Sequence, residues 1–200
     1  MELKYSPTSP FVRKVLVVAH EVGVIDRITL TRVDLQGDRD ELERLNPLSK
    51  IPVLVNDDGA VLYDSTVICE YLDTTFGAHR LLPAHGPQRW NVMTRIALAD
   101  GMLDAALLVR VERMRAKERQ SNDWIARQMS KVTAALDSFE RTLPARDKPL
   151  DMADIALVCG LGYLPMRLPE LVDYPTWPGL RELHARMSER PSFAHTMPPK

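Results

Sequence analysis

A serine near the N-terminus stands where a helix is expected to begin, and such a position can bind an anion. Ser9 precedes Pro10, and apolar residues then recur at helical spacing, at Val12, Val15, Leu16, Ala19 and Val22. Serine is a preferred N-cap, and proline suits the first helical position because its missing amide hydrogen would have no partner there. A hydroxyl on the positive end of a helix suits a thiolate or a carboxylate. By itself the pattern also describes a plain helix cap.

A second pair of the same kind, Asp64-Ser65, precedes another amphipathic segment. The apolar residues of that segment are Val67, Ile68, Tyr71, Leu72 and Phe76. Free backbone amides and a side-chain oxygen at a helix N-terminus can hold a carboxylate, and a plain N-cap is the alternative. Between the two caps lies Ile51-Pro52, where the proline precedes an apolar strand at a position that tolerates it. The sequence therefore offers two candidate anion sites and one proline-led strand.

These features need a fold that brings distant segments together. Residues 1–5 and 28–33 are expected to be strands on either side of the first helix, which predicts a right-handed parallel βαβ unit. Residues 53–55 and 60–63 flank an Asn-Asp-Asp-Gly turn, so they should pair antiparallel. With a short helix at 38–45 the order is β-α-β-(α)-β-β-α. This order predicts one mixed four-stranded sheet with helices packed on it.

The second half of the chain is predicted to be helical. Residues 81–88 have the composition of a linker, and no convincing strand follows them. Helices are expected at 89–117, 123–143 and 175–190. A further, very apolar helix follows the cap formed by Asp151 and Asp154, so its surroundings must bury it. We therefore expect two domains, 1–80 and 89–200, joined by 81–88.

Composition argues against several classes of partner. The chain has 200 residues and a formal net charge of -1, and its basic stretch at 110–119 is interrupted by Glu112 and Glu118 and lacks aromatic residues. Nucleic acid is therefore not an expected partner. No signal-peptide pattern and no apolar run of membrane-spanning length is present, so no membrane partner and a cytoplasmic location are expected. Cys69 and Cys159 lie in apolar runs and are predicted to be core residues.

Two carboxylates in the long helix, Asp100 and Asp104, lie four residues apart and share a helix face. They could form a carboxylate pair or half of a metal site. A solvated or ion-paired face is favoured, because Arg95 and Arg110 lie in the same helix and no His-x-x-x-His accompanies them. None of the five histidines has metal-ligand spacing, so no metal is expected.

The order of elements and three motifs resemble one known family. The Ser-Pro-Phe at 9–11, the run Asn-Pro-Leu-Ser-Lys-Ile-Pro-Val-Leu at 46–54 and the later Asp64-Ser65 are similar to the N-terminal thioredoxin-like domain of cytosolic glutathione transferases. The serine resembles that of the serine-type bacterial and plant members. The resemblance implies an α/β thioredoxin-like domain followed by an all-α helical bundle. It also implies a homodimer that uses glutathione as co-substrate.

The resemblance assigns one part of the tripeptide to each motif. It implies that the Ile51-Pro52 bond is cis, so that the Ile51 backbone pairs with the cysteinyl part of glutathione as an added strand would. Ser65 and neighbouring amides would hold the γ-glutamyl carboxylate, and Asp64 would hold its ammonium group. Lys50 would reach the glycyl carboxylate.

Ser9 would then be the catalytic residue, donating a hydrogen bond to the glutathione thiolate. Lowering a thiol pKa from about 8.5 to about 6.5 requires roughly 2.7 kcal/mol of preferential thiolate stabilisation. A hydrogen bond to a charged group contributes roughly 1.5–3 kcal/mol and a helix end roughly 0.3–1 kcal/mol, so no base is needed. Tyr5 and Thr8 are rival donors. A cysteine at position 9 would instead have indicated thiol-disulfide chemistry.

The acceptor would be a small hydrophobic electrophile bound between the domains. The expected lining of its pocket is Phe11, Met102, Leu103 and Leu107. The resemblance also places Asp100 near the dimer axis, where it would touch the glutathione of the partner subunit. Two alternatives stay open: a glutathione-binding regulatory or scaffold protein with little turnover, and a glutathione-dependent isomerase or dehalogenase.

Overall fold

A mixed four-stranded sheet organises the N-terminal part of the computed structural model, which describes residues 1–34, 37–172 and 174–199. The strands are β1 (Glu2–Tyr5), β2 (Thr29–Arg32), β3 (Val53–Val55) and β4 (Val61–Leu62), in the order β2-β1-β3-β4. β1 pairs in parallel with β2 and antiparallel with β3, which pairs antiparallel with β4. The predicted thioredoxin-like sheet is thereby confirmed.

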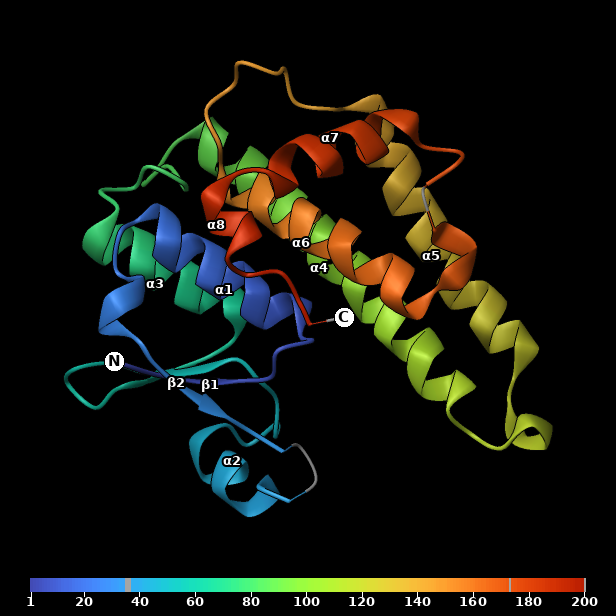
Figure 1. Ribbon diagram of the computed structural model, residues 1–200, viewed down its shortest axis with the longest axis horizontal. Coiled ribbons are helices and arrows are strands. Elements are labelled where there is room, and N and C mark those ends of the chain that lie inside the picture. Colours follow the sequence, from blue (N-terminus) through green and yellow to red (C-terminus); the bar gives the residue numbers. More distant parts are fainter. Residues whose placement is uncertain (35–36, 173, 200) are drawn as a thin grey trace.

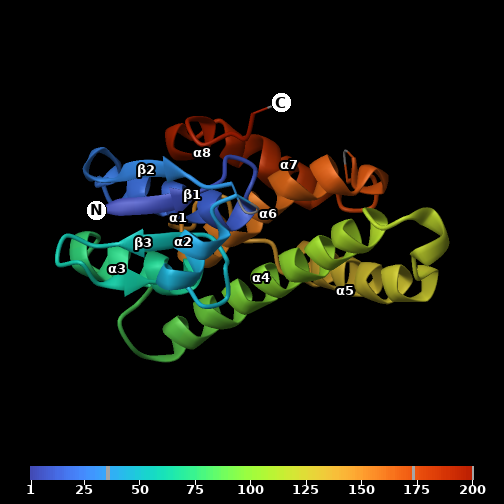
Figure 2. The same cartoon turned by 90° about the horizontal axis from the view of Figure 1, so that it is seen from below.

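Helices cover both faces of this sheet (Figures 1 and 2). The helices of this part are α1 (Pro10–Glu21), α2 (Arg39–Leu45) and α3 (Ser65–Phe76), with a 3-10 turn, η1 (Ile25–Arg27). Side chains alternate across a strand, so neighbours in β3 enter different layers. Leu54 packs with the core formed with α1 and α3, whereas Val53 packs with Leu42 of α2. The sheet is thus the middle of three layers.

The remainder of the described chain is helical, as predicted. Its elements are α4 (Pro87–Arg113), η2 (Lys117–Arg119), α5 (Asn122–Arg141), α6 (Met152–Arg167), η3 (Pro169–Leu171), α7 (Pro178–Ser188) and α8 (Pro191–Ala194). Figure 2 shows α4 and α5 as a long pair that extends away from the sheet. Helix α6 packs against α1 on one side and α4 on the other, and so joins the two parts of the molecule (Figure 1). No helix among the described residues is long and apolar enough to cross a membrane.

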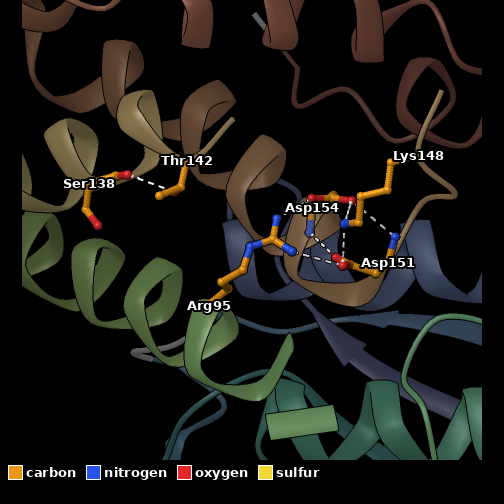
Figure 3. A network of polar contacts seen from close by, with 6 residues as sticks. All are labelled: Arg95, Ser138, Thr142, Lys148, Asp151 and Asp154. Carbon is orange, nitrogen blue, oxygen red and sulfur yellow. Dashed lines mark hydrogen bonds and ion pairs between the residues drawn. The ribbon is translucent and has the colours of Figure 1, made fainter. Parts of the chain in front are cut away.

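The N-terminus of the buried, apolar helix α6 is closed by a reciprocal cap (Figure 3). The Asp151 carboxylate accepts from the Asp154 amide at 2.9 Å, and the Asp154 carboxylate accepts from the Asp151 amide at 3.3 Å. Arg95 of α4 and Lys148 bind both carboxylates. The predicted cap is confirmed, and its cations tie α6 to the first long helix of the second half.

Asp154→Ala should lower the free energy of unfolding by about 2–3 kcal/mol, because it removes one half of the cap and a partly buried partner of Arg95. Urea unfolding followed by circular dichroism measures the change. Glu182→Ala, which removes an exposed partner of Arg146, is the control and should leave the midpoint in place. Equal midpoints for the two variants would contradict the assignment.

Both cysteines lie in the core, as predicted. Cys69 of α3 and Cys159 of α6 are 0% and 1% exposed. Burial raises the pKa of each thiol to about 12. Neither thiol is therefore placed to act as a nucleophile.

Candidate functional site

Ser9 stands at the junction of β1 and α1, where the chain turns from the sheet into the helix. Its amide donates to the Ser6 carbonyl at 3.1 Å, and its Oγ accepts from the Val12 amide at 3.3 Å. Ser9 is therefore the N-cap that the sequence predicts. Because the cap uses a lone pair of the oxygen, the hydroxyl hydrogen is left to donate to an anion at the helix N-terminus.

A cavity of about 190 Å³ opens beside Ser9, between the loops of the sheet and helices α4 and α6. Its lining consists of Thr8, Ser9, Pro10, Phe11, Ser49, Lys50, Ile51, Leu103, Asp104, Leu107, Arg110 and Tyr163. Three of the four residues expected around the acceptor, Phe11, Leu103 and Leu107, thus lie together. The cavity therefore joins the first helix N-terminus to an apolar wall supplied by the second half of the chain.

Met102 is the exception. It is 1% exposed and its methyl group lies toward Gly160 of α6, so it belongs to the core between α4 and α6 and not to this cavity. Leu103 is 2% exposed and also lies beside Gly160, but unlike Met102 it lines the cavity as well. Which of the two meets the cavity depends on where α6 packs.

The Ile51-Pro52 bond is cis, as the resemblance implied. The loop before it is held by Asn46, whose side chain donates to the Lys50 carbonyl at 2.9 Å and accepts from the Leu48 amide at 3.0 Å. Ile51 itself forms no backbone hydrogen bond with any residue that the structure describes. Its amide and carbonyl are thus available to an extended peptide.

A second cavity, of about 150 Å³, lies at the N-terminus of α3. Asp64 is the N-cap, and its Oδ1 accepts from the amides of Thr66 at 3.0 Å and Val67 at 3.4 Å. Ser65 begins the helix and is 2% exposed. The lining is Phe11, Asn46, Leu48, Lys50, Ile51, Pro52, Tyr63, Asp64, Ser65, Asp100 and Asp104. Two helix N-termini therefore open on neighbouring cavities.

The two cavities adjoin, because Phe11, Lys50, Ile51 and Asp104 line both. Together they form one groove with the α1 N-terminus at one end and the α3 N-terminus at the other. Burial raises the pKa of the Asp104 carboxyl, Lys50 opposes this, and Asp100 adds to it. The groove thus carries an amine and a carboxylate where its two halves meet.

Asp100 is ion-paired within its own chain, in line with the ion-paired face favoured by the sequence. Lys14 of α1 donates to its carboxylate oxygens at 2.8 and 2.7 Å, and Thr66 of α3 donates to it at 2.9 Å. Lys14 is 1% exposed. This cluster lies beneath the second cavity and ties α1, α3 and α4 together, whereas a contact of Asp100 with a partner subunit stays a prediction.

Reasoning from the sequence missed Arg110 and Tyr163 of the first cavity. Arg110 was counted among the charges of a solvated basic face, and Tyr163 was not singled out, yet both line the first cavity. The only available signal for Arg110 was its spacing of three residues from Leu107 on the same helix. Among the described residues, no group of three His, Cys, Asp or Glu side chains is arranged to hold a metal.

Comparison with known proteins places this geometry in a family. Residues 8–75 match the family described as glutathione S-transferase, N-terminal domain. The uncharacterised GST-like protein YibF of Escherichia coli K12 is 35% identical over the whole of both chains. The chain belongs to the glutathione transferase family.

Solved structures of glutathione transferases agree with this assignment. A family member from Pseudomonas fluorescens Pf-5 with bound glutathione is 40% identical and superposes with a TM-score of 0.92, over 100% of this chain and 99% of that one. A second structure from that organism, 40% identical with a TM-score of 0.90 and covering all of both chains, holds S-(propanoic acid)-glutathione. The family match spans Ser9, Ile51-Pro52 and Asp64-Ser65, whereas Arg110 and Tyr163 lie outside it.

Proposed function

We propose that this chain is a glutathione S-transferase that binds glutathione along the groove and joins its sulfur to a small hydrophobic electrophile. One observation carries the proposal: the Ser9 hydroxyl, the unpaired Ile51 backbone and the capped start of α3 line two adjoining cavities. Each offers the kind of group that one part of the tripeptide requires. The glutathione-bound relative from Pseudomonas fluorescens supports this ligand for the present chain.

In the proposed complex, the γ-glutamyl carboxylate lies at the N-terminus of α3. The Ser65 amide and hydroxyl donate to that carboxylate, and Asp64 binds the ammonium group. The cysteinyl backbone pairs with Ile51, and Lys50 binds the glycyl carboxylate. This arrangement directs the sulfur toward Ser9.

The chemistry is a nucleophilic attack by a thiolate. The thiol loses its proton to solvent, and the Ser9 hydroxyl stabilises the resulting anion by donating a hydrogen bond. The sulfur lone pair then forms a bond to the electrophilic carbon, and the leaving group departs with its electron pair. The protein contributes alignment and thiolate stabilisation, and the apolar wall of the first cavity holds the acceptor.

Calorimetric titration with glutathione is the first test. We expect saturable heat at millimolar glutathione or below, and conjugation of an aryl or alkyl halide above the uncatalysed rate. Ser65→Ala should weaken glutathione binding roughly tenfold, because the hydroxyl, at the wall of the second cavity, is a direct donor to a charged group. An absence of heat at millimolar glutathione would refute binding, and binding without turnover would favour a regulatory protein.

A further inference from the structure

The Arg110 side chain of α4 is a cation in the wall of the acceptor cavity, and no described residue pairs with it. The next two arginines of the chain are neutralised by acids, Arg113 by Glu170 at 2.7 Å and Arg115 by Glu112 at 3.0 Å. The Arg110 guanidinium forms no hydrogen bond or ion pair with any residue that the structure describes, and Arg110 lines the cavity. A guanidinium presents several donors in a fixed planar fork, which matches a carboxylate.

A second unpaired donor stands in the same wall. The side chain of Tyr163, from α6, is 5% exposed and lines the cavity, and its hydroxyl forms no hydrogen bond with a described residue. The Arg167 guanidinium lies 5.9 Å from the centre of its ring and helps to fix the ring in place. Because this hydroxyl has no partner among the described residues, it can donate to a ligand in the cavity.

The rest of the lining limits where a charged ligand group can lie. Phe11, Leu103 and Leu107 are apolar, so they suit the body of the acceptor. The other charged groups, Lys50 and Asp104, also line the second cavity, which the proposed glutathione complex fills. Arg110 is absent from the lining of the second cavity, which leaves it for the acceptor.

We propose that Arg110, assisted by the Tyr163 hydroxyl, binds a carboxylate on the acceptor, so that the preferred electrophiles are small apolar molecules bearing a carboxylate away from the reacting carbon. This inference rests on the proposed transferase function and names its substrate class. For a benzylic chloride, the glutathione thiolate forms the carbon–sulfur bond, and the carbon–chlorine bond breaks with chloride carrying away the electron pair. Arg110 and Tyr163 remain chemically unchanged and act by positioning the acceptor.

The test compares two electrophiles of the same shape, para-chloromethylbenzoate and para-chloromethylbenzamide. After correction for their uncatalysed rates, the native enzyme should prefer the acid. Arg110→Gln should lower kcat/KM for the acid by about tenfold and change kcat/KM for the amide by less than about twofold. The loss is about tenfold because Arg110 is partly exposed, and a partly exposed ion pair lies at the lower end of the range for charge-assisted hydrogen bonds. Tyr163→Phe should lower kcat/KM for the acid by about threefold. Arg113 lies on the same helix but is paired with Glu170, so Arg113→Gln should leave kcat/KM for both electrophiles unchanged.

Binding of the two S-conjugates, measured by calorimetry, gives a readout that does not depend on turnover. The acid conjugate should bind more tightly than the amide conjugate, and Arg110→Gln should abolish the difference. Glutathione that binds normally together with an unchanged acid-to-amide ratio in Arg110→Gln would overturn this inference alone. Failure of glutathione itself to bind would overturn the transferase function and this inference with it.

Discussion

Ser9→Ala is expected to lower kcat/KM for conjugation by roughly tenfold to a hundredfold while the chain still folds. The hydroxyl is the expected donor to the thiolate, and such a bond contributes roughly 1.5–3 kcal/mol, each 1.36 kcal/mol being a factor of ten in rate. Without the donor, the pKa of the bound thiol rises toward that of free glutathione. The conjugation rate at neutral pH therefore falls, and the pH at which this rate is half of its maximum shifts upward. Titration of the thiolate absorbance of the complex measures this shift directly.

The same substitution also removes a helix cap, so stability and activity must be separated. Ser9 Oγ accepts from the Val12 amide at 3.3 Å, which is long, and loss of such a cap costs about 0.5–1 kcal/mol. Ser9→Thr keeps both the cap and the hydroxyl and should retain most of the activity. Glutathione affinity in Ser9→Ala should fall only modestly. Unchanged conjugation would move the role to Thr8, which lines the same cavity.

The helix caps and the strand pairings were predictable from the sequence, because they depend on residues close together in the chain. Ser9, Asp64 and Asp151 were each recognised as N-caps from residue type and the apolar pattern that follows, and each is an N-cap in the structure. The parallel pairing of β1 with β2 and the antiparallel pairing of β3 with β4 followed from the crossover helix and from turn chemistry. The cis bond at Pro52 followed only from the resemblance, because a cis prolyl bond is uncommon in general.

Features that depend on packing between distant helices were not predictable. Helical spacing shows that Leu103 and Leu107 share a face, but it does not show what that face meets. The position of α6 decides that Met102 is core and that Arg110 and Tyr163 line one cavity. Periodicity within one helix holds no information about that position, so the apolar part of the acceptor pocket was largely predicted, whereas Arg110 and Tyr163 were not.

The burial of Lys14 also depends on packing between distant helices, and it leads to the second prediction of a large effect. A lysine among apolar residues of a helix resembles a surface residue, yet this one is 1% exposed because Asp100, 86 positions away, neutralises it. Lys14→Met should lower the free energy of unfolding by about 3 kcal/mol. Removal of one partner of a buried pair costs about 3–5 kcal/mol, and the Asp100 side chain, at 20% exposed, keeps some contact with water.

A double-mutant cycle separates the ion pair from the packing of the lysine chain. Lys14→Met/Asp100→Asn should be more stable than the sum of the two single changes predicts, because the second substitution removes the charge that the first leaves unpaired. Arg39→Met, in an exposed pair with Glu43, should leave the urea midpoint in place. Additive losses of unfolding free energy would mean that Lys14 stabilises the chain through its aliphatic contacts alone. Non-additive losses of unfolding free energy would show that the packing of α1, α3 and α4 against one another, beneath the groove, depends on this charge pair.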